Sequence, residues 1–162
     1  MSIEFIKTRE QDGATWLWVE PSQWLTTHEQ LFGDGAVRFE WLTATHNLAD
    51  EFELTSSVAS ETLNQRWILN STVTDARIDS VVGVYSVADF HEREVEQMFG
   101  LVFSGVNTRD PAFVAKFAGY PLRRDFQLET RVQTPWPGAV EPDENARRRP
   151  SLPPGVFVEW SK

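Results

Sequence analysis

The alternation of apolar and polar side chains predicts a small β-sheet in the first half of the chain. The run TWLWV at residues 15–19 is rich in β-forming residues and is closed by Pro21, so we expect a strand there. Three further segments alternate in the same way and lie near residues 37–42, 52–54 and 67–69. The first of them places Val37, Phe39 and Trp41 on one face. We expect these three segments to pair as antiparallel strands, the last two as a hairpin.

Apolar side chains at helical spacing predict two helices. The first lies within SQWLTTHEQLFG and should end at Gly33. The second should span about residues 87–99, because Ser86 with Asp89 fits a capping box and Gly100 suits the left-handed position after a helix. The run VVGVYS before it is too short to assign and fits an extended segment or one helical turn. Together these elements predict an α+β fold, with a mixed or antiparallel sheet of three to four strands packed against two main helices.

The end of the chain has a different composition. Six of the nine prolines lie from residue 133 onward, and such a segment cannot form a packed domain of its own. It still carries the large aromatic residues Trp136, Phe157 and Trp160, which an extended arm can use to anchor on a neighbouring protein. A disordered tail with incidental aromatic residues is the alternative. The chain is therefore expected to consist of an α+β domain over residues 1–132 and an extended partner-binding tail over residues 133–162.

Charge and cysteine content narrow the classes of function. The chain has 15 Lys and Arg against 24 Asp and Glu, a formal net charge of -9, which disfavours binding to nucleic acids and to anionic membrane surfaces. It has no cysteine, so it cannot hold an iron–sulfur cluster or a zinc–thiolate site by itself, and any redox centre would belong to a partner. The first residues do not resemble a signal peptide and no run of about 18 apolar residues occurs. We expect a soluble, cytoplasmic protein.

The charged stretch DFHEREVEQMFG at residues 89–100 could be a metal site, an acid/base centre or a charged helix face. On a helical wheel of about 100° per residue, its apolar half holds Val87, Phe90, Val95, Met98 and Phe99 together with His91 and Glu94. The other half, which we expect to face solvent, holds Glu92, Arg93, Glu96 and Gln97. A carboxylate on an apolar face must be paired, so we expect Glu94 to form an ion pair within the chain or across an interface. The candidate partners are Arg123 and Arg124 in GYPLRRDF. Glu94→Ala should then be more harmful than Glu92→Ala.

Metal binding and catalysis have weaker support. HEREVE begins like the zinc-binding pattern His-Glu-x-x-His, but Val95 stands where the second histidine is needed, and His28 and His46 have no ligand spacing to His91. We find neither a phosphate-binding loop nor a nucleophile–histidine–acid set. No catalytic, cofactor-binding or metal-binding residue is therefore expected. The residues indicate a binding or assembly domain, with a stand-alone binding module or a small enzyme that uses Glu94 and His91 as the alternative.

Two motifs, in this order, resemble a known family. HEREVEQMFGLVF is similar to the Glu-Arg-Glu signature of the 30 kDa subunit of respiratory complex I, which in bacteria is a subunit of NADH-quinone oxidoreductase, and GYPLRRDFQL is similar to a second segment of that family. The resemblance covers about residues 37–138, and TPWPGAVEP with LPPGV looks like the actinobacterial form. It implies structural or interface roles for the matched positions, which are Glu92, Arg93, Glu94, Phe99, Gly100, Phe103, Gly119, Pro121, Leu122, Arg123, Arg124 and Asp125. In the tail, Trp136 and Trp160 are expected to be interface residues.

The resemblance implies a non-catalytic structural or assembly subunit in the peripheral arm of a membrane-associated NADH:quinone oxidoreductase, which couples electron transfer from NADH to quinone with proton translocation. It would bind no cofactor itself and would pack against partner subunits that hold FMN, iron–sulfur clusters and quinone. It would lie at the cytoplasmic side of the cell membrane as part of a hetero-oligomer. One departure from the family is that Val106 stands where a histidine is expected and the arginine pair after it is missing. This leaves open an equivalent subunit of a membrane-bound group 4 nickel–iron hydrogenase or of a ferredoxin- or F420H2-linked complex.

Overall fold

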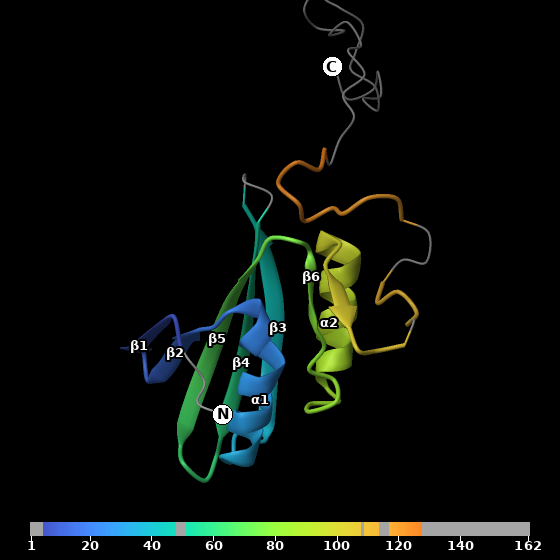
Figure 1. Cartoon of the computed structure of the whole chain (residues 1–162). Helices are drawn as coiled ribbons and strands as arrows, with labels where there is room; N and C mark the ends of the chain where they lie inside the picture. The colour runs from blue at the N-terminus through green and yellow to red at the C-terminus, as the bar shows by residue number, and fades with distance from the viewer. Residues whose placement is uncertain (1–4, 48–50, 108, 114–116, 128–162) are drawn as a thin grey trace, which may run out of the picture. The chain divides into compact units, whose positions relative to one another are not determined.

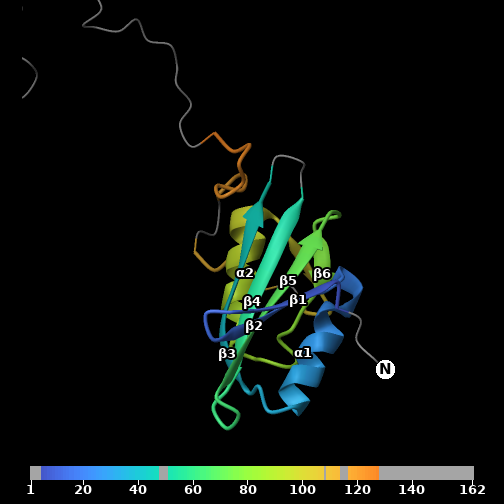
Figure 2. The same ribbon diagram turned by 90° about the vertical axis from the view of Figure 1, so that its left-hand side faces the viewer.

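The computed structural model describes residues 5–47, 51–107, 109–113 and 117–127, and these ranges contain a five-stranded mixed sheet (Figures 1 and 2). The strand order is β1-β2-β5-β4-β3. The strands are β1 (Lys7–Gln11), β2 (Ala14–Trp18), β3 (Arg38–His46), β4 (Phe52–Ser60) and β5 (Gln65–Val73). β2 and β5 are parallel, and the other neighbouring pairs are antiparallel. The α+β class and the β4–β5 hairpin are confirmed, with one strand more than the sequence predicts.

Two helices lie on the same side of this sheet (Figures 1 and 2). A single turn, η1 (Pro21–Gln23), leads into α1 (Trp24–Gly33), and α2 (Ala88–Phe99) follows a turn after β6 (Arg77–Asp79). β6 pairs in parallel with β7 (Val102–Ser104), so a second, two-stranded sheet flanks α2. Both predicted helices are confirmed, and the core lies between them and the inner face of the sheet. No helix in the described ranges is long and apolar enough to cross a bilayer.

The β1–β2 hairpin is made possible by its turn. Asp12 and Gly13 have φ values of 53° and 73°, as a two-residue turn with a left-handed backbone requires. All five residues of β1 are exposed, so this strand shows no apolar alternation. It is therefore the strand of the five-stranded sheet that the sequence pattern does not reveal.

A register shift in β3 changes which side chains face the core. Phe39 lies opposite Val58 and Trp41 opposite Ser57, so Glu40 is the extra residue of a β-bulge. The predicted common face for Val37, Phe39 and Trp41 is wrong, because the bulge turns Trp41 outward. Beyond it, the buried side chains of β3 are Leu42, Ala44 and His46.

The start of α2 also differs from the prediction. No side chain caps this end of the helix, so the capping box of Ser86 and Asp89 is wrong; instead the Asp89 N–H donates to the carbonyl of Ser86 at 3.3 Å. The residues before it form turns, with the Tyr85 N–H bonded to the Val81 carbonyl at 2.8 Å, which is the spacing of a helical turn. At the other end, Gly100 has the predicted left-handed backbone, with φ of 76°.

His28 joins α1 to the sheet as a buried neutral imidazole. Its Nδ1 donates to the Trp24 carbonyl at 2.8 Å, since a carbonyl can only accept, and its Nε2 accepts from the Ser56 hydroxyl at 2.8 Å. Burial lowers the pKa of His28 to about 4, although the bond to Trp24 acts in the opposite direction. Charging the ring would add a proton at Nε2, where the Ser56 hydroxyl now donates, in a site closed to water.

His28 should make the fold acid-sensitive. Because its folded pKa of about 4 lies below its ordinary value of 6.5, its contribution to stability is complete above pH 6.5 and is lost as the pH falls through 4. At about 1.4 kcal/mol per pKa unit, the free energy of unfolding should fall by about 3 kcal/mol. Urea unfolding of wild type and His28→Gln across this pH range would measure this loss. The difference in unfolding free energy between the two should shrink toward low pH. An NMR midpoint for His28 near 6.5 would show this account to be wrong.

Candidate functional site

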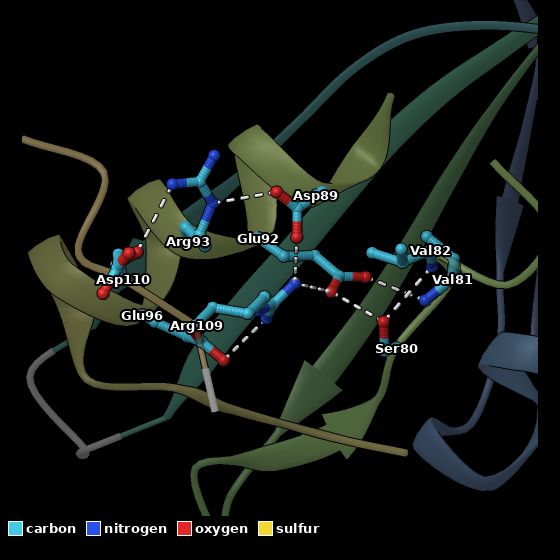
Figure 3. Close-up of polar contacts among 9 residues, drawn as sticks. All are labelled: Ser80, Val81, Val82, Asp89, Glu92, Arg93, Glu96, Arg109 and Asp110. Atoms are coloured by element: carbon cyan, nitrogen blue, oxygen red, sulfur yellow. Dashed lines mark hydrogen bonds and ion pairs between the residues drawn. The ribbon is translucent and has the colours of Figure 1, made fainter. Parts of the chain in front are cut away.

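The helix that holds the Glu-Arg-Glu signature, which we call the signature helix, is α2. Its most unusual side chain is Glu92, which is fully buried on the inner face of the helix (Figure 3). The other buried residues of this helix are Ala88, Val95 and Phe99, at spacings that place them on the same face. A carboxylate enclosed among such residues is stable only if donors surround it. Those donors come from two other parts of the chain.

The turn after β6 supplies two of the donors. The Ser80 hydroxyl donates to Oε2 of Glu92 at 2.7 Å, and the Val81 N–H donates to Oε1 at 2.8 Å. Ser80 Oγ in turn accepts from the Val82 N–H at 3.2 Å. The carboxylate therefore fixes the turn that precedes α2 against the middle of the helix.

The third donor is Arg109, from the segment that follows β7. Its Nη1 lies 3.0 Å from Oε2 of Glu92 and 3.2 Å from Oδ1 of Asp89, and its Nη2 lies 2.8 Å from Oε1 of Glu96. Only 12% of the Arg109 side chain is exposed, so one guanidinium group holds three carboxylates of α2 in a largely enclosed site (Figure 3). Arg93 adds a pair with Asp89 at 2.9 Å. We call these five residues the acid–arginine cluster.

Burial is the largest single influence on the pKa of both Glu92 and Arg109. It raises the pKa of Glu92, and the bonds from Ser80, Val81 and Arg109 offset that rise only in part. Burial also acts to lower the pKa of Arg109, but its bonds to Glu96 and Glu92 outweigh this effect and raise that pKa. Desolvation therefore determines the direction of the pKa shift at the Glu92 carboxyl but not at the Arg109 guanidinium.

The structure corrects the predicted location of the buried charge. Glu94 is only partly buried and forms no ion pair with Arg123 or Arg124, whereas Glu92, which the wheel placed toward solvent, is enclosed. The error came from Val87 and Phe90, two large apolar residues that drew the predicted inner face toward themselves. Both are exposed. The predicted need for an arginine was right, but the enclosed carboxylate is Glu92 and its arginine is Arg109. A pair of Glu94 with Arg123 or Arg124 is wrong, and a pair of Glu94 across an interface stays a prediction.

The second motif docks on the end of the first. Leu122 donates its N–H to the Met98 carbonyl at 3.1 Å, and Arg123 Nε donates to the Phe99 carbonyl, so both cap the last turn of α2. The Arg123 guanidinium lies 5.0 Å from the ring centroid of Phe52 and 4.6 Å from that of Tyr120. The two motifs that carry the family resemblance are thus in contact.

One glycine permits this contact, and a second permits a close approach within the second motif. A Cβ on Gly100 would lie 2.6 Å from the Tyr120 ring, and a Cβ on Gly119 would lie 2.7 Å from the Phe126 ring. Both glycines also have a positive φ, of 76° and 97°. Each position therefore requires glycine for its backbone and for the aromatic ring that covers it.

The remaining predicted site residues lie around this contact or outside the described ranges. Phe103 is buried in β7, and Pro121 is partly buried. The Arg124 N–H donates to His46 Nδ1 at 3.2 Å, and the Asp125 side chain is 70% exposed. Trp136, Trp160 and the whole predicted tail lie outside the described residues, so their roles remain predictions.

The described residues do not assemble a metal centre, since no group of three or more acidic or histidine side chains within those ranges could hold a metal ion. A pocket of about 380 Å³ opens beside the acid–arginine cluster, and its lining includes Arg93, Glu96 and Arg109. These charged groups are bonded within the cluster. The arrangement is suited to holding α2, the turn after β6 and the 109–113 segment together.

The fold and the cluster thus define an α+β domain whose buried charges connect its own elements. Residues 17–132 match the family described as "Respiratory-chain NADH dehydrogenase, 30 Kd subunit", and the chain belongs to this family. The resemblance inferred from the two motifs is confirmed.

Two relatives show the extent of the similarity, and both are the NADH-quinone oxidoreductase subunit that is designated C. The chain is 32% identical over 139 residues to that of Maricaulis maris, covering 84% of this chain and 64% of the relative. It is 30% identical over 114 residues to that of Rickettsia bellii, covering 69% and 55%. The chain therefore spans less than two thirds of the length of these relatives.

Two solved structures share the fold. A trypsin-resistant fragment (1–134) of Nqo5 superposes with a TM-score of 0.58 at 17% identity, covering 64% of this chain and 89% of the fragment. A chain of the archaeal membrane-bound sulfane sulfur reductase complex superposes with a TM-score of 0.68 at 18% identity, covering 75% and 77%. Identities this low establish the common fold alone.

Replacing Glu92 should destabilise the protein far more than replacing Glu94. Glu92→Ala leaves Arg109, Ser80 and the Val81 N–H without their common acceptor, a loss of about 3–5 kcal/mol for a broken buried pair. Glu94→Ala, two residues further along and so on the opposite side of the helix, should change the free energy of unfolding by no more than about 0.5 kcal/mol. Urea unfolding at pH 7 measures both. Equal losses would contradict the assignment of Glu92 as the buried charge.

Gly100→Ala should cost more than the matched change Gly13→Ala. Both glycines have a φ near 75°, but a Cβ on Gly13 meets nothing within 4 Å, whereas one on Gly100 overlaps the Tyr120 ring. The ring must move away and lose its stacking with Arg123, an extra cost of about 0.5–1 kcal/mol. In a Tyr120→Ala background this excess should disappear. An excess that persists there would point to backbone strain instead.

Proposed function

We propose that this protein is a non-catalytic structural subunit of the peripheral arm of a membrane-associated NADH:quinone oxidoreductase. In this role it would support electron transfer from NADH to quinone, coupled to proton translocation, by holding partner subunits in place. The family match and the names of the relatives support this assignment.

The observation that supports the non-catalytic role is that three acidic residues of α2 are bonded to arginines of the same chain. Asp89, Glu92 and Glu96 are all bonded to arginines of the same chain, and Glu92 has no exposed surface. A general acid or base must reach the proton it transfers, which an enclosed and fully bonded carboxylate cannot do. Glu92 therefore stabilises the domain instead of acting on a substrate, and the ion pairs of Asp89 and Glu96 with Arg109 support the same role for them.

Partner subunits would then hold the cofactors. The chain has no cysteine for an iron–sulfur cluster, so the clusters would be bound by neighbouring cluster-bearing subunits. We assign the FMN to a partner subunit as well, and the quinone to a quinone-site subunit. The protein would lie on the cytoplasmic side of the cell membrane and be held there through the complex.

Purification from the native host tests this proposal. A tagged copy of the full chain, extracted in mild detergent, should carry with it iron–sulfur and flavin-containing subunits and NADH-dependent quinone reductase activity. A tagged soluble protein produced at the same level is the control. Recovery of a nickel–iron hydrogenase large subunit would instead favour the related hydrogenase-type complex. Recovery of the chain alone at native levels would contradict membership of any such assembly.

A further inference from the structure

Within the described ranges, one acidic residue of α2 lacks the arginine partner that the others have. Asp89, Glu92 and Glu96 are each paired with an arginine, but Glu94 forms no hydrogen bond or ion pair with any residue in the described part of the chain. Glu94 is nevertheless partly buried. Arg93, its neighbour, is already engaged by Asp89 at 2.9 Å. The cation that would balance Glu94 is therefore not provided by the described residues.

Glu94 lies on an apolar stripe of the helix. Val87 and Phe90 precede it by seven and four residues, which places all three side chains on one face, and Val87 is 64% and Phe90 45% exposed. Phe113, itself 52% exposed, packs edge-to-face on Phe90 with 5.7 Å between ring centroids. Glu94 thus lies one helical turn from Phe90 and two turns from Val87, on the same face, and water still reaches both apolar side chains.

Further exposed apolar residues lie on neighbouring elements, and buried or partly buried rings connect one of them, Phe32, to Phe90. Ring contacts run from Phe90 through His91, Phe39 and Tyr85 to Phe32, with centroid separations of 6.1, 5.7, 5.4 and 5.4 Å. The end of α1, the start of β3 and the start of α2 lie at the same end of the domain (Figure 1). We define the aromatic face as the exposed apolar residues that gather there, Phe32, Val37, Val87, Phe90 and Phe113.

Exposed apolar residues that gather at one end of a domain in this way are typical of the centre of a protein–protein interface. We propose that the aromatic face and Glu94 together dock another subunit, which presents apolar side chains and one arginine or lysine opposite Glu94. An arginine suits this position because its aliphatic stem can cover Phe90 or Val87 while its guanidinium reaches the carboxylate. The proposal rests on the proposed function, since it requires that the chain be part of an assembly, and it adds the surface and the charge of the partner.

Site-specific photo-crosslinking in the native assembly tests which molecule covers this face. A benzophenone amino acid in place of Phe90 or Val87 should link the full chain to a peptide of another subunit that contains an arginine or lysine. The same amino acid in place of Ile6, which is 63% exposed near the opposite edge of the sheet, is the matched control and should not reach that peptide. The absence of a crosslink, a crosslink to a second copy of this chain, or a linked peptide without a basic residue would each overturn the proposal.

Charge variants test the role of Glu94. Glu94→Arg should lower the amount of chain retained in the purified complex by about tenfold, and Glu94→Gln should lower it less, because a buried interfacial charge pair depends on both partners. The control is Glu53→Arg, an exposed position on β4 that alternates with the buried Phe52 and Leu54, so it faces away from the helices and should leave retention unchanged. All three variants should unfold like wild type in urea. Equal retention of Glu94→Arg and Glu53→Arg would contradict the docking site.

These results separate the inference from the proposed function. If wild type brings down the iron–sulfur subunits but the Glu94 variants are retained like wild type and the benzophenone at position 90 links to no partner, only the docking surface is wrong. If wild type itself brings down no partner, the proposed function is wrong and the docking proposal falls with it.

Discussion

The burial of Glu92 is the constraint on which the arrangement of the second half of the domain depends. A carboxylate without solvent must receive donors from every side, and it does so from the turn after β6 and from Arg109. Those donors come from segments on either side of α2 in the sequence, so the charge specifies where the helix lies relative to β6 and to the 109–113 segment. With the inner face of α2 occupied in this way, the outer stripe with Glu94 is left for other contacts.

Much of the fold could be predicted because its apolar periodicity is strong. β2, β4, β5 and both helices follow patterns that survive in the structure. β1 has no buried residue and so no alternation, and its one local signal is the Asp12–Gly13 turn. The bulge at Glu40 is invisible for another reason: apolar residues keep alternating across it while the pairing with β4 shifts by one residue.

The site was predicted less well, since its decisive contacts are tertiary. The sequence shows that one carboxylate of α2 must be buried and paired, but Val87 and Phe90 shift the apparent inner face toward Glu94. Removing those two exposed residues from the wheel leaves an inner face centred near Glu92, bounded by Ala88, Val95 and Phe99. Arg109 lies in a segment without periodicity, so no local pattern links it to the helix. The end of α2 at Gly100, by contrast, could be predicted from the sequence, because a left-handed residue after a helix favours glycine at that one position.

The coupling free energy between Glu92 and Arg109 tests the central claim most directly. A double-mutant cycle with Glu92→Gln and Arg109→Met, followed by urea unfolding of all four proteins, isolates the energy of the pair from the other effects of each change. If the buried pair organises the domain, the two substitutions together should be less harmful than the sum of their separate effects by about 2 kcal/mol. Effects that add to within about 0.5 kcal/mol would contradict the account.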